Sequence, residues 1–198
     1  MTKPLIVGLG GTTRADSQSE LALRLAMAAA QSAGAETLTF TGKQLELPIY
    51  GSDAGSSPDA SRLVSAMRRC SGVIISTPSY HGGMSGMIKN ALDYTEDLRN
   101  DSRPYFDGRA VGIIVCAAGW QNIGTTLVGV RSMVHALRGW PTPMGVGVNT
   151  QTKVFDSRGE CLLEPVTEQI ELLSRQVVDF ARSQQPAFEA SKAESVAV

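Results

Sequence analysis

The chain lacks the features that mark most membrane, secreted, metal-binding and nucleic-acid-binding proteins. No apolar run approaches the roughly 18 residues that a membrane-spanning helix needs, and the first residues contain no secretory apolar region. The three cysteines form no CxxC pair, and two histidines cannot by themselves complete an ordinary zinc site. A net charge of −1 gives no basic surplus for nucleic acid. We therefore expect a cytoplasmic protein with reduced thiols that binds no membrane, no nucleic acid and no metal ion.

The order of the apolar segments predicts one α/β domain. A chain of 198 residues has the length of a single domain. Short apolar segments alternate with helical periodicities, which predicts a parallel sheet with helices on both faces. The expected strands are residues 5–9, 37–40, 73–76, 111–117 and 144–148. Five strands favour the flavodoxin-like order 2-1-3-4-5 over a six-stranded dinucleotide fold.

The C-terminal residues have a different composition from the rest of the chain. Residues 184–198 are polar and rich in Ala and Ser, without the apolar period of the preceding helix. We expect the flavodoxin-like domain to cover residues 1–183 and the remainder to form a disordered tail.

Residues 10–19 follow the first expected strand and have the composition of a phosphate-binding loop. The N-terminus of a helix offers unpaired N–H groups and a partial positive charge to a phosphate. Thr12, Ser17 and Ser19 add hydroxyl donors, and Arg14 adds a permanent charge that can bind two phosphate oxygens. The alternative is that Ser17 only caps the helix and that Arg14 lies in solvent.

Two other phosphate-binding motifs fit the chain less well. The Gly-Lys-Ser/Thr triplet of a Walker loop is absent. Residues 8–13 match a dinucleotide fingerprint only in part, because Thr13 stands where the third glycine belongs. The second strand ends near Phe40 without a carboxylate for an adenosine ribose. The first loop therefore predicts a monophosphate held by hydroxyl groups.

A second loop, residues 77–86, connects the third expected strand to a helix, which is where open α/β sheets build ligand sites. Tyr80 offers an aromatic ring to a flat ligand, unless it only covers the edge of the sheet. The N–H groups of His81, Gly82 and Gly83 can donate to such a ligand, because glycine allows the backbone to approach closely. The two loops together predict a phosphorylated, planar cofactor.

We predict no catalytic side chain. Ser85 is not a hydrolase nucleophile, because Met87 stands where the second glycine of Gly-x-Ser-x-Gly belongs. Lys89 and Asp93 have the i, i+4 spacing of an ion pair on a helix surface. His81 is expected to form hydrogen bonds within its loop.

Four segments, taken in this order, resemble the NADPH-dependent FMN reductase family. They are Gly11-Thr12-Thr13-Arg14 with Ser17 and Ser19, Leu47-Pro48-Ile49-Tyr50, Thr77-Pro78-Ser79-Tyr80, and Gly86-Met87-Ile88-Lys89-Asn90-Ala91-Leu92-Asp93. The similarity covers about residues 5–180. Many relatives carry Asn where Ser19 stands, and the serine variant is similar to the flavin reductases of two-component monooxygenases.

The resemblance implies a flavodoxin-like fold, FMN as cofactor and NADPH or NADH as hydride donor. It implies that Arg14, Ser17 and Ser19 hold the FMN phosphate, that residues 78–81 border the isoalloxazine ring, and that the loop after the fourth strand follows the pyrimidine side. Trp120 in that loop either stacks on a ring or forms a subunit contact. Family members often form homodimers or homotetramers. The predicted cofactor-binding residues are Thr12, Arg14, Ser17, Ser19, Thr77, Pro78, Ser79, Tyr80, His81, Gly82, Ala118 and Gly119.

These observations predict an NAD(P)H-dependent FMN reductase with a small-molecule electron acceptor, or a partner monooxygenase that receives the reduced flavin. One alternative is a reductase of quinones, azo compounds or metal ions that retains its FMN. Another is a flavodoxin-type electron carrier, although such carriers tend to be strongly acidic and this chain has a net charge of −1. A third alternative is a regulatory or structural module that binds flavin without turnover. The sequence does not distinguish NADPH from NADH.

Overall fold

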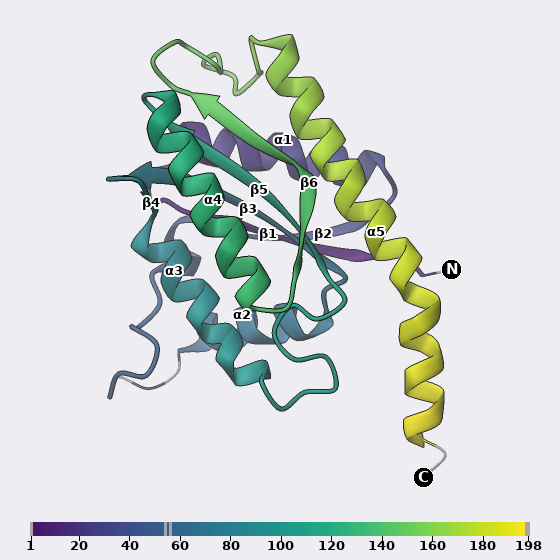
Figure 1. The fold of residues 1–198 in the computed structure, drawn as a ribbon. Helices are drawn as coiled ribbons and strands as arrows, with labels where there is room; N and C mark the ends of the chain where they lie inside the picture. Colours follow the sequence, from purple (N-terminus) through teal and green to yellow (C-terminus); the bar gives the residue numbers. More distant parts are fainter. Residues whose placement is uncertain (1, 54, 56, 197–198) are drawn as a thin grey trace.

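A parallel sheet runs through the centre of the computed structural model, which describes residues 2–53, 55 and 57–196 (Figure 1). From edge to edge the parallel strands are β2 (Glu36–Phe40), β1 (Leu5–Gly10), β3 (Gly72–Tyr80), β5 (Ala110–Ala117) and β6 (Trp140–Asn149). In chain order these strands run 2-1-3-4-5, which confirms the predicted flavodoxin-like topology. The sheet also contains β4 (Gly83–Met84), which pairs antiparallel with the end of β3 and was not predicted.

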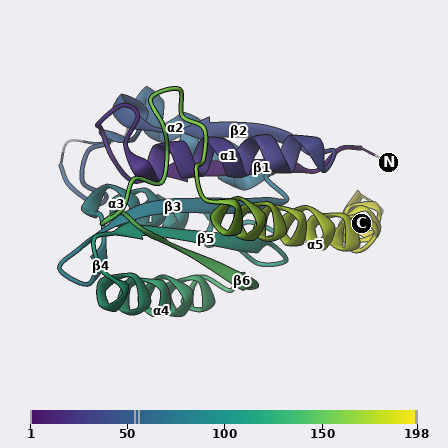
Figure 2. The same ribbon diagram turned by 90° about the horizontal axis from the view of Figure 1, so that it is seen from above.

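Helices cover both faces of this sheet (Figures 1 and 2). One face packs against α1 (Gln18–Ser32) and α5 (Glu164–Val196). The other packs against α2 (Pro58–Arg69), α3 (Gly86–Asp93) and α4 (Trp120–Ala136). Two short 3-10 helices, η1 (Gly42–Leu45) and η2 (Tyr94–Leu98), complete the order of elements.

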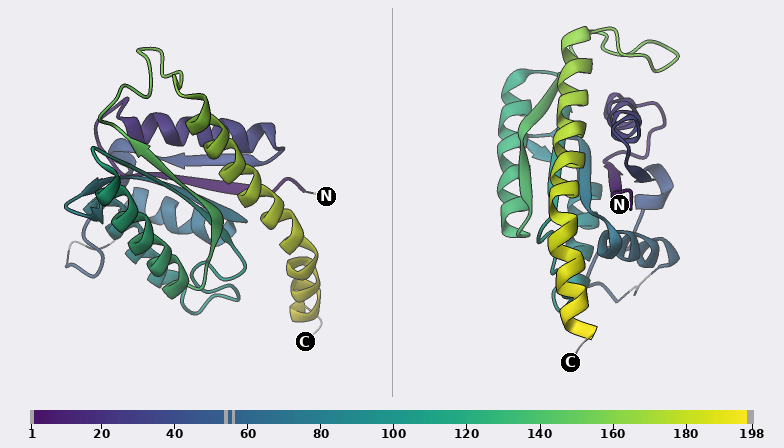
Figure 3. Two further views of the ribbon diagram at one scale, coloured as in Figure 1. Left: turned by 45° about the horizontal axis from the view of Figure 1, so that its top comes forward. Right: turned by 90° about the vertical axis from the view of Figure 1, so that its right-hand side faces the viewer.

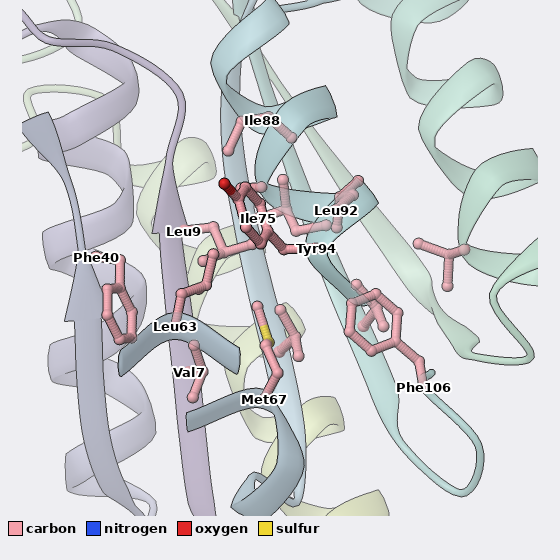
Figure 4. Close-up of a cluster of buried hydrophobic side chains, with 14 of the residues drawn as sticks. Val7, Leu9, Phe40, Leu63, Met67, Ile75, Ile88, Leu92, Tyr94 and Phe106 are labelled. Carbon is pink, nitrogen blue, oxygen red and sulfur yellow. The ribbon is translucent and has the colours of Figure 1, made fainter. Parts of the chain in front are cut away.

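The central strand β3 contributes to both cores, because successive side chains of a strand point to opposite faces. Val73 and Ile75 belong to the cluster under α2, α3 and α4, whereas Ile74 belongs to the cluster under α1 and α5. Figure 4 shows the first cluster, in which Leu63 of α2 and Ile88 of α3 pack over β3. Burial on both faces explains why the strands could be predicted from continuous apolar runs.

Two strands are longer than predicted by several residues. β3 continues past Ser76 to Tyr80, because Pro78 still pairs with β5. β6 begins at Trp140 and not at residue 144, although Pro141 lies within it. Proline is tolerated there because β6 is an edge strand. No further strand lies on its outer side, so no hydrogen bond to such a strand is lost.

Serine side chains cap α1 and α2. The Ser17 hydroxyl accepts the Glu20 N–H at 3.3 Å at the start of α1, as the sequence suggested, and Ser57 caps α2. On α3, Lys89 and Asp93 form the predicted ion pair, with 2.6 Å between Nζ and Oδ1.

A buried arginine fastens the amino-terminal end of the sheet, opposite the predicted loops. Arg109 is 0% exposed and donates hydrogen bonds to backbone carbonyls, among them those of Arg68, Cys70 and Tyr105. These bonds join the start of β5 to the end of α2 and to the preceding loop. Carbonyl oxygens thus balance this buried charge.

The last turns of α5 extend beyond the sheet (Figure 3). The structure gives residues 184–196 as helix where we expected a disordered tail. Alanine and glutamate, which recur in this segment, have high intrinsic helix propensity. The boundary at residue 183 stays a prediction, and residues 197–198 lie outside the described residues. No helix among the described residues combines the length and the apolar character that crossing a membrane requires.

Candidate functional site

A cleft of about 200 Å³ opens at the carboxyl ends of β1, β3 and β5. Because the carboxyl ends of parallel strands share one edge of a sheet, loops far apart in the chain meet there. The lining residues are Thr12, Arg14, Ser17, Gln18, Ser19, Pro78, Ser79, Tyr80, Cys116, Ala117, Ala118 and Thr150. Eight of the twelve residues predicted to bind the cofactor are among them: Thr12, Arg14, Ser17, Ser19, Pro78, Ser79, Tyr80 and Ala118.

The first loop is fixed against β3 by hydrogen bonds. The N–H of Gly11 donates to the carbonyl of Ser76 at 2.9 Å, and the Ser76 hydroxyl donates to the carbonyl of Ser19 at 2.7 Å. A Cβ at position 11 would lie 2.8 Å from Ser85 Oγ and 3.0 Å from Pro78 Cδ, so only glycine fits without a shift. The two loops therefore touch each other at the base of the cleft.

The N-terminus of α1 presents hydroxyl and N–H groups to the cleft. Ser17 and Ser19 are buried, and their hydroxyl oxygens lie 3.3 Å apart. Ser17 caps the helix and also lines the cleft, so its role as a cap does not exclude a role in the site. The first turn of a helix leaves N–H groups without intrahelical partners, and these groups attract anions.

The charges around the first loop leave one positive group available. Asp16 and Glu20 both bind Arg24, at 2.7 Å and 2.9 Å. The hydrogen bonds to Glu20 and then to Asp16 raise the pKa of Arg24. By contrast, the exposed Arg14 has no carboxylate partner among the described residues. The nearby carboxylates are thus compensated, and the charge of Arg14 remains free for an anion.

Gln18 is a lining residue that sequence reasoning missed. Its Oε1 atom is buried and has no hydrogen-bond partner in the described part of the chain. Buried polar atoms are nearly always paired in native proteins, so this atom indicates that a ligand group completes the site. The available signal was its position between two predicted phosphate-binding serines.

Three predicted residues of the second loop do not line the cleft. Thr77 is buried, and its hydroxyl donates to the carbonyl of Pro78 at 2.8 Å and accepts the N–H of Ser85 at 3.1 Å. His81 and Gly82 form the two-residue connection between β3 and β4, with φ values of 53° and 79°. Positive φ at both positions is typical of a tight hairpin turn. Their predicted N–H donors therefore stand at the tip of a hairpin.

The third wall of the cleft is built from small residues at the end of β5. Cys116, Ala117 and Ala118 line it, whereas the predicted Gly119 does not. The N–H of Gly119 instead donates to Asn149 Oδ1 at 3.3 Å and to the Ala117 carbonyl at 3.2 Å. Burial raises the pKa of the Cys116 thiol to about 12, so it stays neutral at neutral pH. Short side chains leave room for a flat ring.

The residues present fit FMN. One end of the cleft offers N–H groups, hydroxyls and the free charge of Arg14, which suits a phosphate dianion. The buried Gln18 Oε1 can accept a hydrogen bond from a hydroxyl of the ribityl chain. Pro78 and the two alanines add compact apolar surface to the same cleft, which suits a ring.

The sequence of the chain is similar to those of FMN reductases. A family profile for NADPH-dependent FMN reductases matches residues 4–153. The chain is 25% identical over 176 residues to an NAD(P)H-dependent FMN reductase of Pseudomonas aeruginosa, covering 84% of this chain and 89% of that protein. It is 36% identical over 85 residues to an FMN-dependent NADPH-azoreductase of Staphylococcus aureus, covering 43% of this chain and 38% of that protein.

Solved structures share the fold. The flavoenzyme FerB, an NAD(P)H:(acceptor) oxidoreductase of Paracoccus denitrificans, superposes with a TM-score of 0.74 at 19% identity, over 91% of this chain and 98% of that chain. An NADH:FMN oxidoreductase superposes with a TM-score of 0.68 at 16% identity, over 91% of this chain and 90% of that chain. At these identities the likeness concerns the fold.

The fold is flavodoxin-like. The chain belongs to the NADPH-dependent FMN reductase family. It is an NAD(P)H-dependent enzyme that uses FMN and acts on small molecules, as the sequence predicted.

Proposed function

We propose that FMN binds in this cleft with its phosphate at the N-terminus of α1, and that the enzyme catalyses hydride transfer to it from NADPH or NADH. The observation that carries this assignment is the coincidence in one cleft of the unpaired Arg14, the buried serines and the unsatisfied Gln18 Oε1. Each of these features lacks a full set of protein partners and matches a group of FMN.

The chain's own residues have distinct roles in this proposal. Ser17, Ser19 and the N–H groups of the first turn of α1 hold the phosphate, and Arg14 compensates its charge. Pro78, Tyr80 and Ala118 set the width of the slot for the ring. Bound FMN supplies the ring system that accepts the hydride.

Hydride transfer requires positioning and no side-chain acid or base. The lining residues in the described part of the chain include no histidine, aspartate or glutamate, which suits this chemistry. Tyr80 is 59% exposed at the edge of the cleft, so a nicotinamide can approach from solvent. The protein therefore contributes orientation and access.

We further propose that FMN is an exchangeable substrate, and that reduced flavin serves a small-molecule acceptor or a partner monooxygenase. The open mouth of the cleft, with the exposed Arg14 and Tyr80, supports exchange. The alternative, a reductase that retains its FMN, requires the same cleft with slower release.

We also propose that the protein is a cytoplasmic homo-oligomer. All three cysteines are free thiols, which suits a reducing compartment. Trp120, Val128 and Trp140 are exposed apolar side chains that an interface would cover. Sedimentation velocity at several protein concentrations tests this, and a monomer at all concentrations contradicts it.

Anaerobic mixing of protein, FMN and NADPH tests the proposed activity. We expect the visible absorption of FMN to bleach rapidly, and far more slowly without protein. A solution that stays yellow for minutes indicates an electron carrier. Steady-state assays with varied free FMN then separate the two reductases: saturation with FMN supports exchange, whereas activity of the purified yellow protein without added FMN supports retention.

A further inference from the structure

A hydroxyl pair joins the wall of the cleft to α4. The oxygen atoms of the Ser79 and Thr126 hydroxyls lie 2.7 Å apart, although the residues are separated by 47 positions. Ser79 lines the cleft, whereas Thr126 is 1% exposed within α4. The Ser79 hydroxyl also lies 3.4 Å from the carbonyl of Asn122, a longer contact. The hydroxyl of Ser79 is therefore hydrogen-bonded to α4.

The same helix supports a second wall of the cleft. α4 begins at Trp120, directly after Gly119, and the lining residue Ala118 precedes that glycine. The β3–β4 hairpin lies beside the helix as well, and a Cβ added at Gly82 would reach Thr125 Cγ2 at 3.6 Å. α4 is thus in contact with the wall formed by the end of β3 and continuous with the wall formed after β5.

We propose that Thr126 is a positioning residue, which holds Ser79 and so fixes the spacing of the two walls between which the ring of FMN binds. This inference rests on the proposed function. It adds a residue outside the cleft to those that determine FMN affinity.

The physical reason is preorganisation. Without the hydroxyl of Thr126, the end of β3 is held to α4 less firmly in the free protein. FMN must then fix the position of this segment when it binds, and this ordering reduces the affinity. A neutral hydrogen bond corresponds to about a two- to tenfold change in an equilibrium constant, which limits the effect on FMN affinity. A Thr126 variant without the hydroxyl should therefore have a higher dissociation constant for FMN even when it folds like the wild type.

Titration of the apoprotein with FMN, together with thermal unfolding, tests the proposal. Thr126→Val keeps the shape of the side chain and removes the hydroxyl, so we expect FMN to bind about two- to tenfold more weakly. Thr126→Ser keeps the hydroxyl and removes a buried methyl group, so we expect a lower melting temperature with wild-type affinity. Thr125→Val is the matched control, because the Thr125 hydroxyl donates within the helix to the carbonyl of Gln121 and has no bond to another element among the described residues.

A double-mutant cycle locates the effect in the hydroxyl pair. We expect Ser79→Ala combined with Thr126→Val to weaken FMN no further than Thr126→Val alone. Wild-type FMN affinity in Thr126→Val would overturn the proposal, and so would equal losses of FMN affinity in Thr126→Ser and Thr126→Val. The proposal also fails if the effects of Ser79→Ala and Thr126→Val on FMN affinity are fully additive. Failure of the wild-type protein to bind FMN would refute the proposed function instead, so the two results are distinct.

Discussion

Removal of the positive charge of Arg14 should weaken the binding of FMN and spare the binding of riboflavin. Arg14 lines the cleft without a carboxylate partner among the described residues, while Arg24 compensates the neighbouring Asp16 and Glu20. A hydrogen bond to a charged group contributes about 1.5–3 kcal/mol. Because Arg14 is exposed and screened by solvent, we expect the lower half of that range for Arg14→Ala, or about a 10- to 40-fold increase in the dissociation constant.

The assay is fluorescence titration of apoprotein with FMN and with riboflavin, which differ only in the phosphate. The control is Arg62→Ala, which also removes an exposed positive charge, on α2 and outside the cleft. We expect the loss for FMN to shrink as salt is raised, because salt screens exposed charges.

The two ligands separate loss of charge from damage to the cleft. Equal weakening of FMN and riboflavin in Arg14→Ala would mean that the substitution distorts the loop. Unchanged FMN affinity would remove Arg14 from the phosphate site and refute the reasoning.

Three further outcomes follow from the packing. Gly11→Ala should lower the free energy of unfolding by about 1–3 kcal/mol, because its Cβ meets Ser85 Oγ at 2.8 Å; Gly86→Ala, at an open position near the start of α3, should be neutral or slightly stabilising in the same denaturant titration. Arg109→Met should lower the free energy of unfolding by about 3 kcal/mol or more, because several buried carbonyls lose their donor; a loss below about 1 kcal/mol would contradict this. With a thiol reagent at neutral pH, only the partly exposed Cys161 should react quickly, and the two buried thiols should react only on unfolding; three fast thiols would contradict the burial.

The parts of the fold that depend on local pattern could be predicted from the sequence. The continuous apolar run 73–76 is buried on both faces, so its period and length indicated a central strand. The prolines near the start of β6 suggested a later beginning, because proline lacks the N–H that a strand donates to its neighbour. The two-residue β4 carries too short a pattern for any prediction.

The same distinction applies to the candidate site. Hydroxyl groups beside a helix start, such as Ser17 and Ser19, signal an anion site within a few residues of sequence. By contrast, the unsatisfied Gln18 Oε1 and the Ser79–Thr126 pair arise from contacts between distant segments. Thr77 shows the converse, since its motif position suggested a ligand contact but its hydroxyl bonds within the loop.

Hydrogen exchange of backbone amides with and without FMN tests most directly whether this cleft is the cofactor site. The account predicts that FMN slows exchange in residues 11–20, 77–80 and 116–120. Exchange should stay unchanged in a second hollow, which lies between α1 and α5 and is lined by Leu25, Ala28, Ser32, Glu171 and Arg175 among others. Protection confined to other segments, or no protection at saturating FMN, would contradict it.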